Sequence, residues 1–278
     1  MFAGWEIMRS EQGTVWPSIV CEEVKRAVSD VISGFGEVVH EVRDKVGREE
    51  EDGKEKERVL AITGVVWKAC ERLGELCVLG VVGILGRKVE AWRDTVRDAL
   101  EELKEWGDDS GEENDDDAVG SDGENADGVE AMFEAANKLP RGRTDLQERL
   151  EESLRRVRLV GTLFQALAKR RVKTFSEFDG RGSTKEVNEK RKEMLRKVDE
   201  LMTLLCTIPD LVDELANAFY ELDVDEVDML LEQISEKAKR AAVEVKLSWD
   251  AKEDEFTAWT TKWEDAMKSK ALFTSKAG

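Results

Sequence analysis

The sequence has few of the residues that most often build metal and catalytic centres. It contains one histidine, His40, and four cysteines, which are Cys21, Cys70, Cys77 and Cys206. The cysteines show no close-paired spacing, so no zinc signature is present. Scattered thiols without a signal peptide predict a reducing, intracellular compartment. The sequence places no serine or cysteine partner beside His40, so we expect a surface residue and not a catalyst.

Long apolar runs and prolines are also scarce. The longest apolar run, 76–85, has about ten residues, whereas a bilayer span needs about 20. Only 3 prolines interrupt the chain and 38% of its residues are charged, which is typical of long exposed helices. The formal net charge of -19 disfavours direct binding to nucleic-acid phosphate. Because no nucleophile–base pair or metal set is visible, we expect no enzyme, no cofactor and no metal.

The strongest pattern is the apolar seam of residues 194–220. Its members alternate in steps of four and three, which predicts a helix packed lengthwise against other helices. The seam consists of Met194, Val198, Leu201, Leu205, Ile208, Val212, Leu215 and Phe219. Pro209 lies in its middle and removes a backbone donor, so we expect a break there, with a second helix beginning near Asp210.

Similar stripes predict the other helices, and the fold class is all-α, an elongated antiparallel bundle or bundles of about six long helices. The predicted helices are 18–46, 54–73, 78–106, 144–173, the broken 194–220, and 224–249 with an extension towards 263. The stripe of the first helix consists of Val20, Val24, Val28, Val31, Phe35, Val38, Val42 and Val46. Ser18 is expected to cap the first helix, and Thr144 with Gln147 the fourth. Gly74 is expected to end the second helix.

Residues 107–142 differ from the rest in composition. The range 107–128 has ten acidic residues, no basic residue and five glycines, which predicts a disordered acidic linker. We therefore expect an N-terminal helical part (1–106), this linker (107–142) and a C-terminal helical part (143–278). The carboxylates do not fit the spacing of a calcium loop. Ser110 and Ser121 each precede an acidic residue by three positions and are candidate phospho-acceptors.

The polar side of the fourth predicted helix is basic. Its residues are Arg149, Arg155, Arg156, Arg158, Lys169, Arg170, Arg171 and Lys173. This pattern fits a solvated face, a clasp for the chain's own acidic tract, or a surface for an acidic partner.

Four segments, in order, resemble the cyclin-D-binding, Maid-like protein family of helix-loop-helix factors that lack a basic region, also called the Grap and cyclin-D-interacting family. They are VWKAC (Val66–Cys70), KVEAWRDTVRDALEELKEW (Lys88–Trp106), LVGTLFQALAKR (Leu159–Arg170) and VDELMTLLCTIPDLVDELANAFYELD (Val198–Asp223). The acidic tract lies in the same place as in the family, and the resemblance covers residues 20 to about 246.

The resemblance implies an all-helical interaction protein of cytoplasm and nucleus. Animal members associate with D-type cyclins and pair with helix-loop-helix proteins, and they negatively regulate cell-cycle transcription. The family offers no catalytic residue to carry over. It has further helices before the part that matches Val20, where this chain has about 19 residues. A missing helix would leave apolar stripe exposed on the first and third predicted helices and favour a homodimer.

We therefore expect a non-enzymatic regulatory module that binds proteins, cyclin-like or helix-loop-helix partners among them, through helix faces. One alternative is a structural helical-bundle adaptor in the cytoskeleton or in trafficking. Another is an acidic, chaperone-like binder of basic proteins that uses the linker. Direct nucleic-acid binding and a membrane span are not expected.

Overall fold

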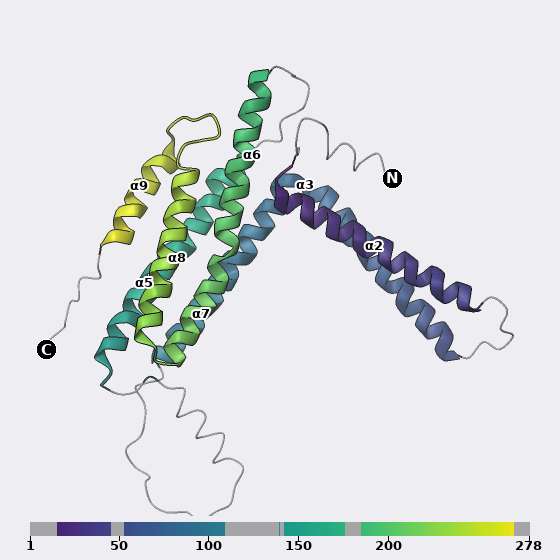
Figure 1. The fold of residues 1–278 in the computed structure, drawn as a ribbon, viewed down its shortest axis with the longest axis horizontal. Helices are drawn as coiled ribbons and strands as arrows, with labels where there is room; N and C mark the ends of the chain where they lie inside the picture. The colour runs from purple at the N-terminus through teal and green to yellow at the C-terminus, as the bar shows by residue number, and fades with distance from the viewer. Residues whose placement is uncertain (1–15, 46–52, 109–138, 140–141, 176–184, 270–278) are drawn as a thin grey trace, which may run out of the picture. The chain divides into compact units, whose positions relative to one another are not determined.

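A computed structural model of the chain describes residues 16–45, 53–108, 139, 142–175 and 185–269 (Figure 1). All regular structure in these residues is helical, so the predicted all-α class is confirmed. Two compact units are present, one made of Met1–Arg87 with Phe175–Asp199 and the other of Lys88–Thr174 with Glu200–Gly278. Most of the predicted linker, with Ser110 and Ser121, lies outside the described residues, so the division at 106 and 143 stays a prediction.

The helices follow the predicted stripes closely. In chain order they are α2 (Ser18–Lys45), α3 (Gly53–Asp108), α5 (Thr144–Leu167), the π-helical turn η2 (Ala168–Val172), α6 (Lys185–Cys206), α7 (Ile208–Tyr220), α8 (Val224–Glu244) and α9 (Glu255–Lys268).

The break predicted in the central seam is confirmed. α6 ends at Cys206 and α7 begins at Ile208, with Pro209 in the first turn of α7. At that position the missing N–H of proline costs no hydrogen bond within the helix. All eight seam residues are buried, from Met194 to Phe219.

The second and third predicted helices form one element, α3, whose interruption lies at Gly80 and not at Gly74. Gly80 has φ 62° and ψ −176°, so the helical path breaks there. Glycine is the residue that adopts this backbone region at little cost, because it has no Cβ. Gly74 stays helical, so its predicted role as a C-terminal cap is wrong.

The last predicted helix is divided in two, because α8 ends at Glu244 and α9 begins at Glu255. The Arg171 guanidinium donates to the carbonyl oxygens of Val245 (2.6 Å) and Lys246 (2.9 Å). A continuing helix would have paired these carbonyls with its own N–H groups. The interruption therefore comes from a contact distant in sequence, which the local apolar pattern does not reveal.

Two helix starts are placed as predicted but are capped differently. Ser18 begins α2, and its N–H and hydroxyl both donate to Asp199 of α6, at 2.7 and 2.8 Å. Thr144 begins α5, but no side-chain cap forms there, so the predicted capping box with Gln147 is wrong. The Arg143 carbonyl instead accepts from the N–H of Gln147 at 3.1 Å. At the start of α2, a carboxylate from another helix thus replaces the predicted side-chain cap.

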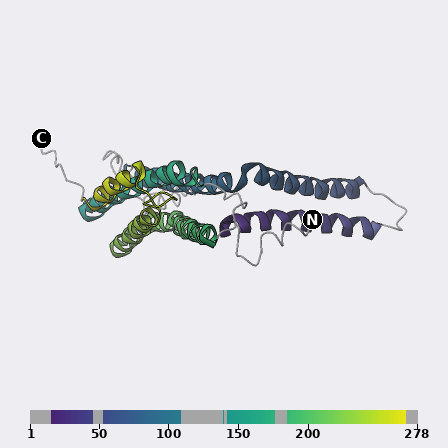
Figure 2. The ribbon, with the colours of Figure 1, turned by 90° about the horizontal axis from the view of Figure 1, so that it is seen from above.

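In the first unit, α2 and residues 53–79 of α3 lie side by side and antiparallel; we name this pair the α2/α3 hairpin (Figures 1 and 2). Gly34 marks the close approach of the two helices, because a Cβ added there would lie 2.9 Å from the Val66 Cγ2 atom. Ion pairs cross the hairpin on both sides of this contact. They are Arg58–Glu41 (3.4 Å), Arg72–Asp30 (3.5 Å) and Arg72–Glu23 (3.6 Å).

The second unit contains the end of α3, α5, α7, α8 and α9. Trp106 of α3 packs against Phe219 and Tyr220 of α7, with ring centroids 6.1 and 5.6 Å apart. α9 docks on α5, where the Trp263 indole N–H donates to the Leu159 carbonyl at 2.9 Å. Aromatic contacts and hydrogen bonds thus complete a closed core in this unit.

Candidate interaction surfaces

The described residues offer little to bind a metal or to act as a nucleophile. No group of three or more His, Cys, Asp or Glu side chains in these ranges is placed to hold a metal ion. Burial raises the pKa of the Cys21 and Cys206 thiols, which favours their neutral form. His40 is exposed and lies 3.3 Å from the Asp44 carboxylate. Within the same ranges, no helix is long and apolar enough to cross a bilayer.

The basic side predicted on the fourth helix is largely engaged in ion pairs within the fold. Arg149 binds the Asp228 carboxylate of α8 through two nitrogens, both at 2.9 Å. Arg155 and Arg156 both donate to Glu152, at 2.7 and 2.6 Å. The hydrogen bonds from Arg155, opposed by burial, lower the pKa of Glu152 to about 2. These arginines hold helices together and do not form an open basic surface.

Arg171 is the most buried of these side chains, at 1% exposure. Besides the carbonyls of Val245 and Lys246, it donates to both carboxylate oxygens of Asp254, at 2.7 and 3.0 Å. Its guanidinium carbon lies 4.3 Å from the centroid of the Phe256 ring. The hydrogen bonds from Arg171 lower the pKa of Asp254 to about 2. We name these five residues the Arg171 cluster; they fix the connection between α8 and α9.

Arg171 lies in η2 and is buried, so its assignment to the polar side of the fourth predicted helix is wrong. The N–H of Lys173 donates to the carbonyl of Ala168, five residues back, at 3.1 Å. A π-helical turn holds one more residue than an α-helical turn, so it rotates the following side chains relative to a 3.6-residue period. A regular period already places Arg171 on the buried side, four residues after Leu167 and seven after Phe164, so its charge and not its spacing led to the polar assignment.

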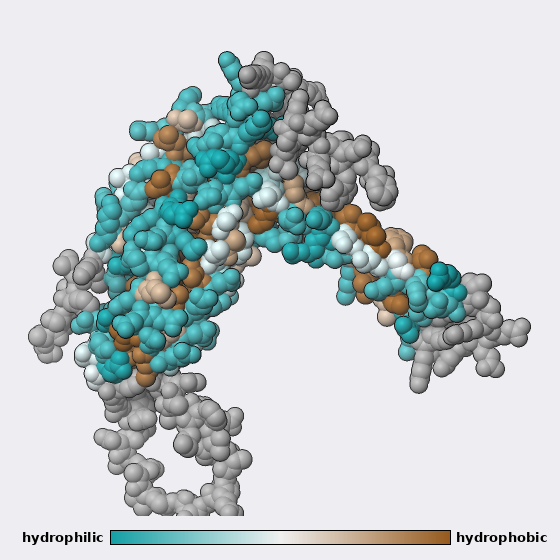
Figure 3. Space-filling view, viewed as in Figure 1, coloured by the Kyte–Doolittle hydropathy of each residue, from teal (hydrophilic) through white to brown (hydrophobic). Residues whose placement is uncertain are grey.

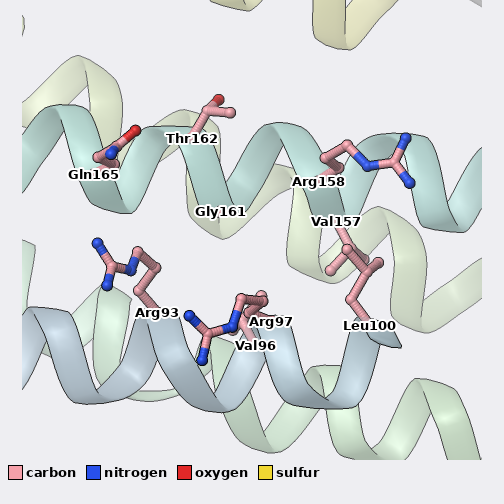
Figure 4. A pocket seen from close by; sticks show the side chains of 9 residues that line it. All are labelled: Arg93, Val96, Arg97, Leu100, Val157, Arg158, Gly161, Thr162 and Gln165. Atoms are coloured by element: carbon pink, nitrogen blue, oxygen red, sulfur yellow. The ribbon is translucent and has the colours of Figure 1, made fainter. Parts of the chain in front are cut away.

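A groove of about 400 Å³ lies between α3 and α5 in the second unit (Figure 4). Its walls carry Arg93, Val96, Arg97, Leu100, Val157, Arg158, Gly161, Thr162 and Gln165. Figure 4 shows the Arg93 guanidinium rising from α3 towards α5, whereas the Arg97 guanidinium lies beside α3. Arg93 donates to Asp94 at 2.8 Å and Arg97 to Asp98 at 3.1 Å. Because neighbouring carboxylates already offset this positive charge, the groove is a weak candidate for an anionic ligand.

A larger candidate surface lies on the α2/α3 hairpin, where Figure 3 shows apolar residues gathered at the surface. Besides Val65 and Val78, six large apolar side chains of the hairpin are 51–71% exposed. They are Ile32, Phe35, Val39 and Val42 of α2 with Leu60 and Trp67 of α3. Soluble proteins rarely expose this many large apolar groups close together unless the surface binds something.

Helix geometry places these six side chains on one face of the hairpin. Two antiparallel helices are related by a two-fold axis perpendicular to their common plane, so equivalent steps on each helix lead to the same side. Phe35 and Trp67 each follow directly after a contact residue, Gly34 or Val66, and each is turned by 100° from that contact. The other four lie on the same side by this rule. We name the six residues the apolar face.

The opposite face of the hairpin is predominantly polar. Arg58 and Arg72 project on that side and reach across to acidic residues of α2. Among the described residues of this face, Val65 alone is a large aliphatic residue that is exposed. The hairpin therefore has two unlike faces, one with ion pairs and one on which exposed apolar side chains gather beside Glu71.

The apolar face corrects two expectations from sequence. Phe35 and Val42 belong to the stripe predicted on the first helix, yet they are exposed. Ala27 and Gly34 form the line of closest approach, and their small size lets the helices meet without the larger side chains. The exposed apolar residues lie mainly on the first and second predicted helices, and Val78, at 89% exposure, is the exposed one of the third.

Comparison with known proteins places the apolar face within a recognised family segment. Residues 8–109 match the family described as Grap2 and cyclin-D-interacting, N-terminal. An uncharacterized protein of Schizosaccharomyces pombe is 26% identical over 275 residues, which are 95% of this chain and 69% of the relative. No solved structure matches the chain. The resemblance noted from sequence is thus confirmed for the segment that forms the hairpin.

Proposed function

Residues 8–109 belong to the Grap2 and cyclin-D-interacting family, and from this premise we propose that the chain is a non-enzymatic regulatory protein that binds other proteins through the apolar face. The family segment contains α2 and all of α3, and therefore every residue of that face. The exposure of these six side chains is the observation that carries the proposal.

The chemistry of the apolar face suits an amphipathic helix of a partner. Its side chains recur every three or four residues on α2 and seven apart on α3, which is the spacing that accepts a third helix along the hairpin. Each side chain that becomes fully buried contributes about 1.5–3 kcal/mol relative to its exposed state. Trp67 and Phe35 are the residue types that most often dominate such interfaces.

The partner class that we propose is a D-type cyclin or a related all-helical protein, with helix-loop-helix proteins and a second copy of the chain as further partners of the same face. The proposed role is negative regulation of cell-cycle progression and transcription, in cytoplasm and nucleus. The family description supports the cyclin partner, and the apolar face supports binding by helix packing.

A binding titration with a purified D-type cyclin tests the proposal. The double variant Val39→Ser with Trp67→Ser removes two large groups from the apolar face, and we expect its affinity to fall by about tenfold or more. Val243→Ser is the matched control, because Val243 is 58% exposed but belongs to α8. We expect this control to bind like the wild type.

Two outcomes would overturn the proposal. Absence of cyclin binding by the wild-type chain would remove the cyclin from the proposal. Equal binding by the wild type and by the double variant would remove the apolar face. Far-ultraviolet circular dichroism of all three proteins ensures that a loss of affinity does not come from a loss of helix. Imaging of the tagged chain in both compartments tests the proposed location, which exclusion from the nucleus would contradict.

A further inference from the structure

We infer that the apolar face also pairs with the apolar face of a second copy of this chain, so that two α2/α3 hairpins form an antiparallel four-helix bundle. In this arrangement α2 of each copy lies over α3 of the other. The inference rests on the proposed function only in taking the apolar face as a binding surface. It names a second occupant of that face, and three properties of the hairpin support it.

The first property is the area that pairing would bury. The six side chains of the apolar face together expose roughly 700 Å² per copy, given their fractional exposure and the usual size of such side chains. A stable interface buries about 800 Å² per partner. The apolar face with its flanking side chains therefore has the size that a specific dimer needs.

The second property is the charge of the hairpin. α2 has six acidic and four basic residues, and residues 53–87 of α3 have four acidic and six basic residues. The acidic and basic residues of these two segments are equal in number, although the whole chain has a net charge of -19. Residues 46–52, which join the two segments, add one basic and four acidic residues, so most of the excess negative charge lies elsewhere in the sequence and two hairpins meet with only a small like charge.

The third property is the pattern of charge along the two outer edges of the hairpin. Lys25 and Arg43 each lie nine residues from Gly34, which is two and a half helical turns, so both lie on the side of α2 opposite the hairpin contact. Glu57 and Glu75 each lie nine residues from Val66 and are placed in the same way on α3. One outer edge therefore carries two basic residues and the other two acidic ones, with Lys68 between the acidic pair and Arg87 3.7 Å from Glu75.

These edges are complementary in register as well as in sign. Because Gly34 lies level with Val66, Lys25 lies level with Glu75, and Arg43 lies level with Glu57, across the hairpin. Within one chain, the members of each pair lie on opposite outer edges. A two-fold axis parallel to the helices stacks α2 over the partner's α3 and brings both pairs together. An arrangement that places α2 over α2 of the second copy would instead bring like charges together.

The pairing has a regulatory consequence. The second copy and a cyclin-like partner occupy the same six side chains, so one excludes the other. A rise in the concentration of the chain then converts binding-competent monomer into a dimer whose apolar face is covered. The chain would therefore bind its partner with an apparent affinity that falls as its own concentration rises.

Sedimentation of the full-length chain over a range of concentrations tests the pairing. We expect the wild type and the Val243→Ser control to shift from monomer to dimer. We expect Val39→Ser with Trp67→Ser to require a concentration about tenfold higher or more for the same shift. A wild type that stays monomeric to about 100 μM, or a dimer that forms equally well in the double variant, would overturn the inference.

Cysteine cross-linking tests the register. In a chain whose four cysteines are replaced by serine, Lys25→Cys with Glu75→Cys is expected to give a covalent dimer with a short bis-maleimide cross-linker, which spans the roughly 8–10 Å between stacked helices. The misregistered pair Lys25→Cys with Glu57→Cys is the control and is expected to give at least about tenfold less, because its cysteines would lie 18 residues apart along the bundle. Equal cross-linking of the two pairs would overturn the proposed arrangement.

These results are separate from the cyclin titration. A monomeric wild type that binds cyclin, and loses binding in the Val39→Ser with Trp67→Ser variant, would refute the pairing and leave the proposed function in place. A dimer with the expected cross-link but no cyclin binding would support the pairing and refute the cyclin partner.

Discussion

The α2/α3 hairpin and the second unit differ in where they place their polar and apolar side chains. The second unit buries polar groups and pairs them, as the Arg171 cluster shows with four hydrogen bonds to Val245, Lys246 and Asp254 around one side chain at 1% exposure. The hairpin keeps its charged groups in ion pairs at the surface and leaves large apolar groups exposed on one face. The difference indicates that the second unit completes its own core, whereas the hairpin leaves part of its apolar surface for another molecule.

Among the substitutions that test this difference, Arg171→Ala is expected to change stability the most. The substitution removes a large buried side chain and its four hydrogen bonds to Val245, Lys246 and Asp254, so we expect a loss of about 3–5 kcal/mol in the free energy of unfolding. Urea unfolding followed by circular dichroism measures this loss. Arg170→Ala, one residue earlier and exposed, is expected to change stability by less than about 1 kcal/mol. Similar losses for the two variants would contradict the structural role of the cluster.

An effect of about 2 kcal/mol is expected for Glu152→Gln, and it should depend on pH. The pKa of Glu152 is about 2 in the folded chain and 4.5 in the unfolded reference, so its ion pairs with Arg155 and Arg156 stabilise the fold fully above pH 4.5. This contribution is lost as the pH falls from 4.5 towards 2. Urea unfolding at pH 7, 4 and 3 should therefore show the difference between wild type and variant shrinking with acid. A difference that is constant across this range would argue against the ion pairs.

Smaller changes in stability, of about 1 kcal/mol and opposite in sign, are expected when two glycines of α2 are replaced by alanine. Gly36→Ala meets no atom within 4 Å and should stabilise the helix by about 0.5–1 kcal/mol, because alanine favours the helix. Gly34→Ala places a Cβ 2.9 Å from Val66 Cγ2 and should destabilise the hairpin by about 1 kcal/mol. Thermal unfolding of both variants measures the contrast. Adding Val66→Ala should make the Gly34→Ala change less harmful, and no such coupling would contradict the close approach.

The smallest effect is expected for Val39→Ser in the dilute chain. Val39 is 63% exposed, so replacing it removes little buried apolar surface, and stability should change by less than about 0.5 kcal/mol. Val66→Ser, at a buried position of the same hairpin, should cost about 2 kcal/mol or more. Urea unfolding at low protein concentration gives both values. A large loss for Val39→Ser would mean that the apolar face is already covered within one chain.

Sequence patterns predicted the helices well, because each helix buries an apolar stripe of its own. The seam from Met194 to Phe219 is buried as predicted, and Pro209 marks the break between α6 and α7. The residues that escaped prediction depend on contacts between distant segments. Asp199 caps α2 across a separation of 181 residues, and Arg171 ends α8 from the far side of η2. No local window contains both members of such a pair.

The apolar face shows why a stripe does not reveal what covers it. A 3.6-residue period identified the apolar side of α2, including Phe35 and Val42, but the period is the same whether a helix faces its own chain or a partner. The small residues Ala27 and Gly34 determine which line of α2 meets α3, and hence which apolar groups remain exposed. Their significance becomes clear only when the position of the second helix is known.

Hydroxyl-radical footprinting of the chain with and without a bound cyclin is the most direct test that the apolar face binds protein. Aromatic side chains are oxidised readily when exposed, and Phe35 and Trp67 are both exposed in the unbound hairpin. We expect their oxidation rates to fall severalfold in the complex, while Met229 of α8, also exposed, reacts at an unchanged rate. A complex that forms while Phe35 and Trp67 react as in the free chain would contradict the account.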